Sequence, residues 1–172
     1  MLGEETAVLR AFARSLTRNA ANADDLVQET LLKAWTNRAR YEEGTNLRAW
    51  LFTILRNTFY SDFRKKRREV EDVDGVHAGR LAEAPTQDHA LAVQDFQAAL
   101  NRLPEDQREA LVLIGAAGLS YEEAAEVLNT AVGTVKSRVS RARSALSETL
   151  GVSSGAELVQ DSHMEAALGS AA

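Results

Sequence analysis

The sequence predicts an all-α protein made of two small helical domains joined by a flexible acidic linker. Apolar residues recur at helical spacing on both sides of the middle of the chain. Only two of the 172 residues are proline, so long helices need not be interrupted. The charges are also segregated along the chain. We place the first domain at residues 1–68, the linker at 69–92, the second domain at 93–150 and a flexible tail at 151–172.

Composition restricts the function classes. The chain is 45% hydrophobic and 26% charged, as is usual for soluble globular proteins. No apolar stretch approaches the ~18 residues of a membrane span, and residues 1–5 lack the basic and apolar regions of a secretory signal. The sequence contains no cysteine, which excludes disulfides, thiol nucleophiles and thiolate metal sites. We therefore expect a cytoplasmic protein without a cofactor or a metal and without membrane insertion.

The net charge of -5 hides three charge zones. Residues 64–68 form a basic run, and residues 69–95 are acidic. A second basic block contains Lys136, Arg138, Arg141 and Arg143. Proteins that only coat DNA are usually basic overall, whereas acidic residues in the linker would repel DNA phosphates. The pattern predicts that the two domains, and not the linker, contact a polyanion.

The first domain contains three predicted helices. An N-terminal helix contains Leu9, Phe12 and Leu16. A second helix, capped by Asn22 or Asp24, runs to about Arg38. Its apolar face comprises Val27, Leu31, Ala34 and Trp35, and its polar side carries Asp25, Gln28, Glu29 and Lys33. Taken alone, the acidic residues there are best explained by favourable charge at a helix N-terminus.

The third helix of the first domain starts near Asn46 or Leu47, after a loop over residues 41–46, and runs to about Arg68. Its core stripe comprises Leu47, Trp50, Leu51, Ile54, Leu55 and Thr58. A different face carries Phe52, Arg56, Phe59 and Phe63, which we expect to pack on the N-terminal helix. The alternative is that aromatics interleaved with cations bind single-stranded DNA, where bases stack and phosphates need neutralising. The residues alone leave both open.

The second domain has the pattern of a helix-turn-helix. A helix closes at about Arg102, and Pro104 opens the next one, from Glu105 to about Ala117. Ser120 and Glu123 form a capping box for a helix from Tyr121 to about Leu128. After a short turn, a last helix runs from Val132 or Gly133 to Leu150.

The last helix has the features of a DNA recognition helix. Once its apolar residues Val135, Val139, Ala142 and Leu146 face inward, Lys136, Ser137, Ser140 and Arg141 must face outward. Such a helix inserts its N-terminal part into the major groove, where Lys and Arg donate to guanine. Arg138 and Arg143 are better placed for phosphates. The alternative is a solvated charged face, but the capped partner helix and the tight turn favour DNA binding.

Four segments in register resemble the extracytoplasmic-function (ECF) sigma factors of bacterial RNA polymerase, over about residues 9–150. Residues 24–35 resemble region 2.2, residues 50–64 regions 2.3 and 2.4, and residues 103–111 and 132–143 region 4. Residues 112–126 look like the EcfG branch, which serves the general stress response of alphaproteobacteria. The resemblance implies a region 2 helical bundle followed by a region 4 helix-turn-helix.

The resemblance also implies site residues. Contacts to the polymerase β′ coiled coil would come from Asp24, Asp25, Gln28 and Glu29. Contacts to the −10 element, including a pocket for a flipped base, would come from Lys33, Asn37, Tyr41, Thr45, Asn57, Arg64 and Lys65, with the 44–46 loop guarding the pocket. Contacts to the −35 element would come from Thr134, Lys136, Ser137, Arg138, Ser140, Arg141 and Arg143.

The implied partners are core RNA polymerase (β′ coiled coil and β flap), promoter DNA and an anti-sigma factor, with a monomer when free. Two alternatives stay open: a sigma-like decoy that binds only an anti-sigma factor, and a plain helix-turn-helix regulator. An enzyme is disfavoured because His77, His89 and His163 are scattered and the sequence contains no phosphate-binding glycine loop.

Overall fold

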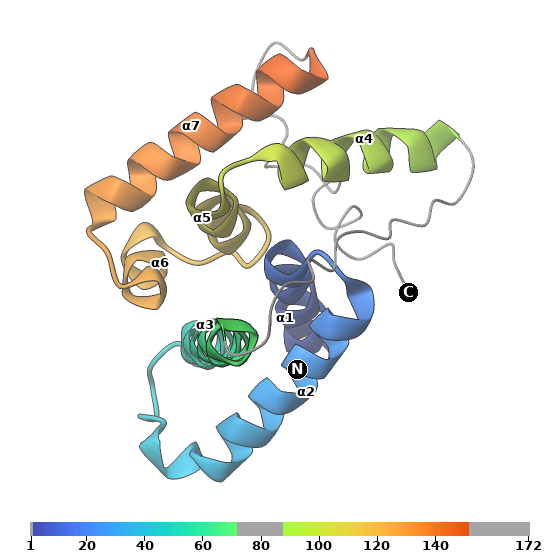
Figure 1. The fold of residues 1–172 in the computed structure, drawn as a ribbon. Helices are drawn as coiled ribbons and strands as arrows, with labels where there is room; N and C mark the ends of the chain where they lie inside the picture. The colour runs from blue at the N-terminus through green and yellow to red at the C-terminus, as the bar shows by residue number, and fades with distance from the viewer. Residues whose placement is uncertain (1, 72–87, 152–172) are drawn as a thin grey trace.

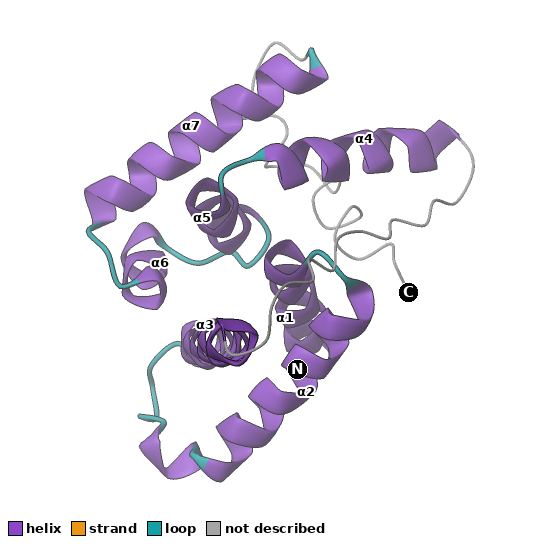
Figure 2. Ribbon diagram, viewed as in Figure 1, coloured by secondary structure: helices purple, strands orange, loops and turns teal. Residues whose placement is uncertain are grey.

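The computed structural model describes residues 2–71 and 88–151, and all regular secondary structure within them is helical (Figure 2). The all-α prediction is confirmed. The N-terminal domain contains α1 (Leu2–Thr17), α2 (Ala20–Thr36), the 3-10 turn η1 (Arg38–Arg40) and α3 (Leu47–Glu71); the C-terminal domain contains α4 (Asp88–Arg102), α5 (Glu105–Gly115), α6 (Tyr121–Leu128) and α7 (Val132–Leu150) (Figure 1). Residues 72–87 of the predicted linker and residues 152–172 of the predicted tail lie outside the described residues.

The N-terminal domain is a bundle in which α1 packs against both α2 and α3. Phe12 and Phe52 are fully buried, and their rings meet edge to face with centroids 5.1 Å apart. This confirms the predicted packing of Phe52 on the first helix. The same prediction is wrong for Phe63, whose side chain is 57% exposed. Phe63 stacks on Phe59 with ring centroids 6.4 Å apart and lines an open hollow together with Leu26 of α2, so much of its ring stays exposed.

The second helix differs from the prediction in two respects. It begins at Ala20 because Asn19 is the N-cap, and the Asn19 side chain accepts a hydrogen bond from the Asn22 backbone N–H at 2.9 Å. The predicted caps at Asn22 and Asp24 are therefore wrong. Trp35, assigned to the apolar face, is 70% exposed. The buried stripe of α2 runs through Ala23, Leu26, Val27, Thr30 and Ala34. At 100° per residue Trp35 falls away from this stripe, on the side of α2 that carries Gln28 and Leu32.

The C-terminal domain forms around α5, α6 and α7, with α4 packed on α7. The capping box is confirmed: the Glu123 backbone N–H donates to Ser120 Oγ at 3.1 Å, and the Ser120 N–H donates to Glu123 Oε2 at 2.8 Å. Asn129 ends α6 in the left-handed conformation. The helix α7 then begins at Val132, as predicted, and the four residues of its predicted inner face are buried. A helix-turn-helix is therefore present.

We expect the Ser120→Ala substitution to lower the free energy of unfolding by about 1 kcal/mol, because an N-cap hydroxyl satisfies a backbone donor that has no intrahelical partner. Chemical denaturation followed by circular dichroism measures the loss. Ser144→Ala is the matched control, since the Ser144 hydroxyl donates to the Ser140 carbonyl inside α7 and alanine favours helix interiors. Equal losses in both variants would contradict the capping role.

The two domains lie against each other. Figure 1 shows α5 beside α1 and α6 beside α3, and the buried apolar residues of both domains form one continuous cluster. This closed arrangement sets the relative placement of the surfaces described below.

Candidate functional site

The outward face of α7 has the predicted composition. Lys136, Ser137, Ser140 and Arg141 are exposed, while the opposite stripe is buried. Arg138 differs from these residues, because its guanidinium pairs with the Asp106 carboxylate at 3.1 Å. The structure therefore presents two hydroxyls and two cations together at the first turns of the second helix of a helix-turn-helix, where base edges are read.

A hollow of about 320 Å³ adjoins this face, between Tyr121 and the middle of α7. Lys136 lies over the Tyr121 ring at 5.6 Å from its centroid. Arg143 is half-buried in the wall, and within the described chain its Nε is buried without a hydrogen-bond partner. The Thr134 carbonyl accepts the Ser137 hydroxyl at 2.9 Å. Cations beside the Ser140, Ser144 and Ser147 hydroxyls make a wall that suits a phosphate.

The structure brings three of the residues predicted to contact the −10 element together in a second hollow of about 320 Å³. Lys33, Asn37 and Asn57 line it, together with Trp50. Lys33 pairs with Glu29 at 2.7 Å and donates to Thr58 Oγ1 at 3.2 Å. These two contacts hold the Lys33 ammonium in one position beside the hollow. The Lys33 amine and the two asparagine amides, beside the Trp50 indole, form a wall that can accept a flat polar group.

Two further predicted residues stand next to this hollow. The Tyr41 ring packs on the Trp50 ring with centroids 5.3 Å apart. The Tyr41 hydroxyl donates to the Thr45 carbonyl at 2.7 Å, which fixes the loop beside the ring pair. Arg64 and Lys65 do not line the hollow and lie exposed further along α3. Trp50, which the sequence assigned to the core, lines this hollow and remains partly exposed.

The outer face of α2 carries a stripe of exposed residues, which we call the α2 face: Asp25, Gln28, Leu32 and Trp35. Leu32 is 68% exposed and Trp35 70%, and the Arg38 guanidinium lies 4.7 Å from the Trp35 ring centroid. Of the other predicted polymerase contacts, Asp24 pairs with Arg10 at 2.6 Å and Glu29 with Lys33. The two apolar members were missed, although their spacing from Gln28 is helical.

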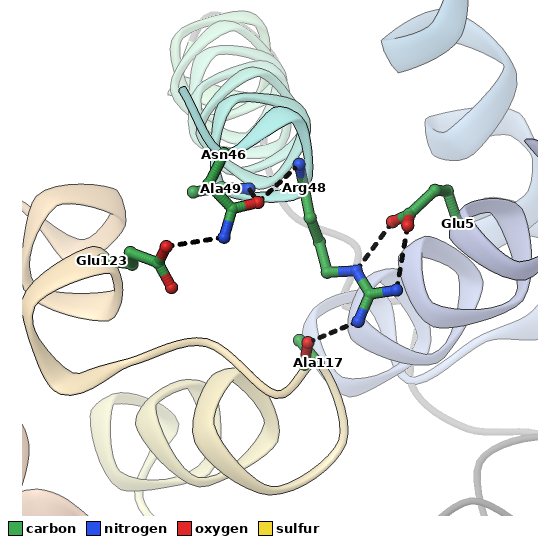
Figure 3. A network of polar contacts seen from close by, with 6 residues as sticks. All are labelled: Glu5, Asn46, Arg48, Ala49, Ala117 and Glu123. Atoms are coloured by element: carbon green, nitrogen blue, oxygen red, sulfur yellow. Dashed lines mark hydrogen bonds and ion pairs between the residues drawn. The ribbon is translucent and has the colours of Figure 1, made fainter. Parts of the chain in front are cut away.

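Polar contacts join the two domains, and one group of them is seen in Figure 3. Asn46 Nδ2 donates to Glu123 Oε1 at 2.6 Å. The Arg48 guanidinium pairs with the Glu5 carboxylate at 2.8 Å and donates to the Ala117 carbonyl at 2.8 Å. Glu123, which completes the capping box of α6, therefore also binds Asn46 at the end of the 41–46 loop.

A second group of contacts joins α3 to α5. Arg56 Nε pairs with Glu109 Oε2 at 2.9 Å. The Tyr60 hydroxyl donates to Glu105 at 2.6 Å and also contacts the Glu109 carboxylate. Burial, and then the hydrogen bonds to these two carboxylates, raise the pKa of Tyr60. The phenol is thus held protonated as a donor.

Arg108 is the largest fully buried side chain of the described residues. Its Nε donates to the Ser15 carbonyl at the end of α1 at 2.7 Å, and Nη1 donates to the Leu103 carbonyl at 3.0 Å. Burial lowers the pKa of the Arg108 guanidinium from its ordinary value. An arginine nevertheless stays charged in proteins, so α1 supplies one of the acceptors that this buried charge requires.

The pKa of Glu123 is lowered, first by the hydrogen bond from Asn46 and then by the Ser120 backbone N–H. A carboxyl group of this kind contributes stability above its unfolded pKa, and the contribution is lost as the pH falls through the folded pKa. We therefore expect the contact between Asn46 and Glu123 to be lost only when the pH falls below the ordinary range of a glutamate pKa. NMR titration of the Glu123 carboxyl checks this: Asn46→Ala should move its pKa back up, whereas Thr53→Ala, within α3, should not. An unchanged pKa in Asn46→Ala would contradict it.

Two family models match the chain, one in each of the two domains. Residues 4–69 match the family model "Sigma-70 region 2", and residues 94–146 match "Sigma-70, region 4". The chain is 56% identical over 161 residues, 94% of its length and 89% of the relative's, to the ECF RNA polymerase sigma factor EcfG of Rhodopseudomonas palustris. The chain belongs to the ECF sigma factors. It is therefore a transcription initiation factor that binds core RNA polymerase and directs it to promoters. The region 2 match overturns the alternative of a plain helix-turn-helix regulator.

Solved structures of this sigma factor's relatives agree with the fold. The sigma factor RpoE of Bartonella quintana, solved in complex with the anti-sigma factor NepR, is 56% identical and superposes with a TM-score of 0.77 over 87% of this chain and 93% of that one. CnrH, solved with the cytosolic domain of CnrY, is 30% identical with a TM-score of 0.58 over 86% and 82%. No helix within residues 2–71 and 88–151 is long and apolar enough to cross a membrane.

Proposed function

We propose that this sigma factor contacts a promoter at two places, the −35 element with α7 and the −10 element with the hollow between α2 and α3, and that it contacts core polymerase with the α2 face. The observation that carries the proposal is the exposed set Lys136, Ser137, Ser140 and Arg141 on a capped helix-turn-helix. These residues suit the major-groove edges of guanine and its neighbours.

The −35 contact extends beyond base edges. Arg143 and Thr134 flank the exposed set, and the hydroxyl-rich hollow at Arg143 suits a DNA phosphate. Arg138 contributes to phosphate binding only after it leaves Asp106 on α5, because that carboxylate occupies one edge of its guanidinium. Phosphate contacts position the domain, while base contacts specify the sequence.

The −10 contact is a pocket for one unstacked base. Removing a base from a duplex costs a few kcal/mol, and stacking on an aromatic ring returns about 1–3 kcal/mol. Trp50 and Tyr41 supply rings, while Lys33, Asn37 and Asn57 supply polar groups that select the base edge. Thr45 holds the loop over residues 44–46, and Arg64 and Lys65 neutralise phosphates farther along α3.

The polymerase contact combines polar and apolar groups. Asp24, Asp25, Gln28 and Glu29 supply acceptors for the β′ coiled coil. Leu32 and Trp35 extend this stripe with exposed apolar area, of the kind that anchors protein interfaces. Region 4 would meet the β flap.

The regulation of this sigma factor is inferred from what is known of its relatives. Similarity to EcfG supports a role in stress-response genes, and the complex of RpoE with NepR supports an anti-sigma factor as a partner. We place the protein in the cytoplasm, where polymerase acts, as a monomer when free. The exposed cations of α7 favour this role over a decoy that binds only an anti-sigma factor.

Run-off transcription with core polymerase on a set of promoter fragments tests the proposal. We expect promoter-specific transcripts that depend on this protein and are lost in Gln28→Ala/Glu29→Ala, with core binding reduced in parallel. Glu148→Ala, an exposed position at the far end of α7, should transcribe normally. Binding to an anti-sigma factor with neither transcripts nor core binding would instead support the decoy.

A further inference from the structure

Lys33 lies where two of the proposed contact surfaces meet. It lines the hollow between α2 and α3, and its ammonium pairs at 2.7 Å with Glu29, one of the carboxylates that we assign to the polymerase contact. A second partner comes from the other helix, since Thr58 Oγ1 accepts a hydrogen bond from Lys33 Nζ at 3.2 Å. An ammonium has three donors, so one remains for a group that enters the hollow.

The two partners of Lys33 differ in burial. The Glu29 side chain is 44% exposed and belongs to the same helix, and such pairs four residues apart on a helix surface are weak and screened by salt. Thr58 is 3% exposed and belongs to α3, which packs against α2. A protein partner can therefore draw Glu29 away from Lys33, whereas Thr58 cannot turn away without unpacking the two helices.

The hydroxyl of Thr58 is used differently from those of other helical threonines. Thr30, Thr36 and Thr53 each donate to the carbonyl four residues earlier in their own helix, which is an ordinary way to satisfy such a hydroxyl. Thr58 Oγ1 accepts the Lys33 ammonium from the neighbouring helix. Valine has nearly the same shape and is more often found buried, so packing alone does not require a hydroxyl at this position. The contact with Lys33 gives the hydroxyl a purpose.

We propose that Thr58 is a positioning residue of the −10 hollow, whose hydroxyl keeps the Lys33 ammonium directed at the unstacked base after core polymerase has engaged Glu29. This inference rests on the proposed function. A lysine ammonium sits on a flexible four-carbon stem, and fixing such a side chain only on binding costs affinity. With Thr58 as a fixed partner, the remaining N–H group of Lys33 approaches the base from one direction and favours an edge that presents an acceptor.

The order of the Lys33 ammonium, followed by nitrogen-15 NMR relaxation on the free full chain, tests the contact without DNA. We expect the ammonium to stay ordered in Glu29→Ala and to become mobile in Glu29→Ala/Thr58→Val. Thr58→Ser keeps the hydroxyl and should keep the order. Thr30→Val, combined with Glu29→Ala, is the matched control, because Thr30 is equally buried but its hydroxyl donates to the Leu26 carbonyl. Equal mobility in Glu29→Ala and in Glu29→Ala/Thr58→Val would overturn the inference.

Binding of the holoenzyme to a promoter fragment gives the functional readout. The fragment is one that run-off transcription shows to be active, with its −10 element single-stranded, and abasic versions remove one −10 base at a time. The parent holoenzyme should lose most affinity at the position whose base the hollow holds. Thr58→Val should weaken binding to the intact fragment about three- to tenfold, the size of one hydrogen bond, but should not weaken binding to that abasic fragment any further. Thr58→Ser and Thr30→Val should bind like the parent.

A double-mutant cycle separates positioning from stability. In the Lys33→Ala background, Thr58→Val should cause no further loss, because the hydroxyl acts through the ammonium. Equal losses in Thr58→Val and Thr30→Val, or a loss that is the same with and without Lys33, would assign Thr58 to packing alone and overturn the inference. A parent holoenzyme that tolerates every abasic −10 position would instead refute the proposed −10 contact, and the role of Thr58 with it.

Discussion

Replacing Lys136 and Arg141 with alanine should reduce promoter-specific transcription at least about 30-fold. Each good contact between such a side chain and a base edge is worth about 1–3 kcal/mol, so the loss of two corresponds to about 2–6 kcal/mol, and every 1.4 kcal/mol is a factor of ten. Both side chains are exposed on α7, so folding should be unaffected. Run-off transcription and the salt dependence of duplex binding measure the loss.

The control for this variant is Arg102→Ala, which removes an exposed cation of α4 outside the helix-turn-helix. Its effect on transcription should be small and should disappear at higher salt, because a distant surface charge acts only through screened attraction. If the double variant transcribes as well as Arg102→Ala does, α7 is not the −35 reader.

The substitutions Leu32→Ala and Trp35→Ala should together weaken binding to core polymerase by about 30-fold or more. Tryptophan at an interface commonly contributes 2 kcal/mol or more, and both side chains are largely solvent-exposed in the free chain. Removing them should change the free energy of unfolding by less than about 0.5 kcal/mol. Fluorescence-detected titration of labelled protein with core polymerase measures the affinity.

Leu47→Ala is the matched control, because Leu47 is also an exposed apolar residue, at 39%, but lies at the start of α3. It should bind core polymerase normally. Comparable losses in Leu47→Ala and in the α2 variant would show that the effect is not specific to the α2 face. Full affinity in the α2 variant would leave only the polar residues of that face as contacts.

The best-predicted part of the fold is the helix-turn-helix, where local signals agree. Ser120 and Glu123 form a capping box within one turn, and the inward stripe of α7 follows the helical period. Both patterns depend on residues within a few positions of each other, so they survive in the folded chain. The errors came where tertiary packing chose between local options. Asn19 capped α2 in preference to Asn22, and Trp35 fell outside a buried stripe that only the bundle geometry defines.

The candidate sites were likewise predicted from the sequence only in part. The exposed set of α7 could be predicted because a helix with one apolar face leaves the other to solvent. The family resemblance placed Lys33, Asn37 and Asn57 at one element, and the structure shows them lining one hollow. Trp50 was missed because an apolar residue at helical spacing is ordinarily core, and only the open wall of this hollow leaves its ring partly exposed.

By itself, the sequence determined the helices of the second domain, the outward cations of α7 and the membership of the chain in a sigma-factor family. The tertiary structure decided the polar contacts between α3 and α5. In sequence, Glu105 and Glu109 are ordinary acidic residues near a helix N-terminus, and Arg56 and Tyr60 belong to a basic helix about fifty positions earlier. Charges separated this far along a chain acquire partners only when the domains pack, because burial of Glu109 turns a solvated carboxylate into one that needs Arg56.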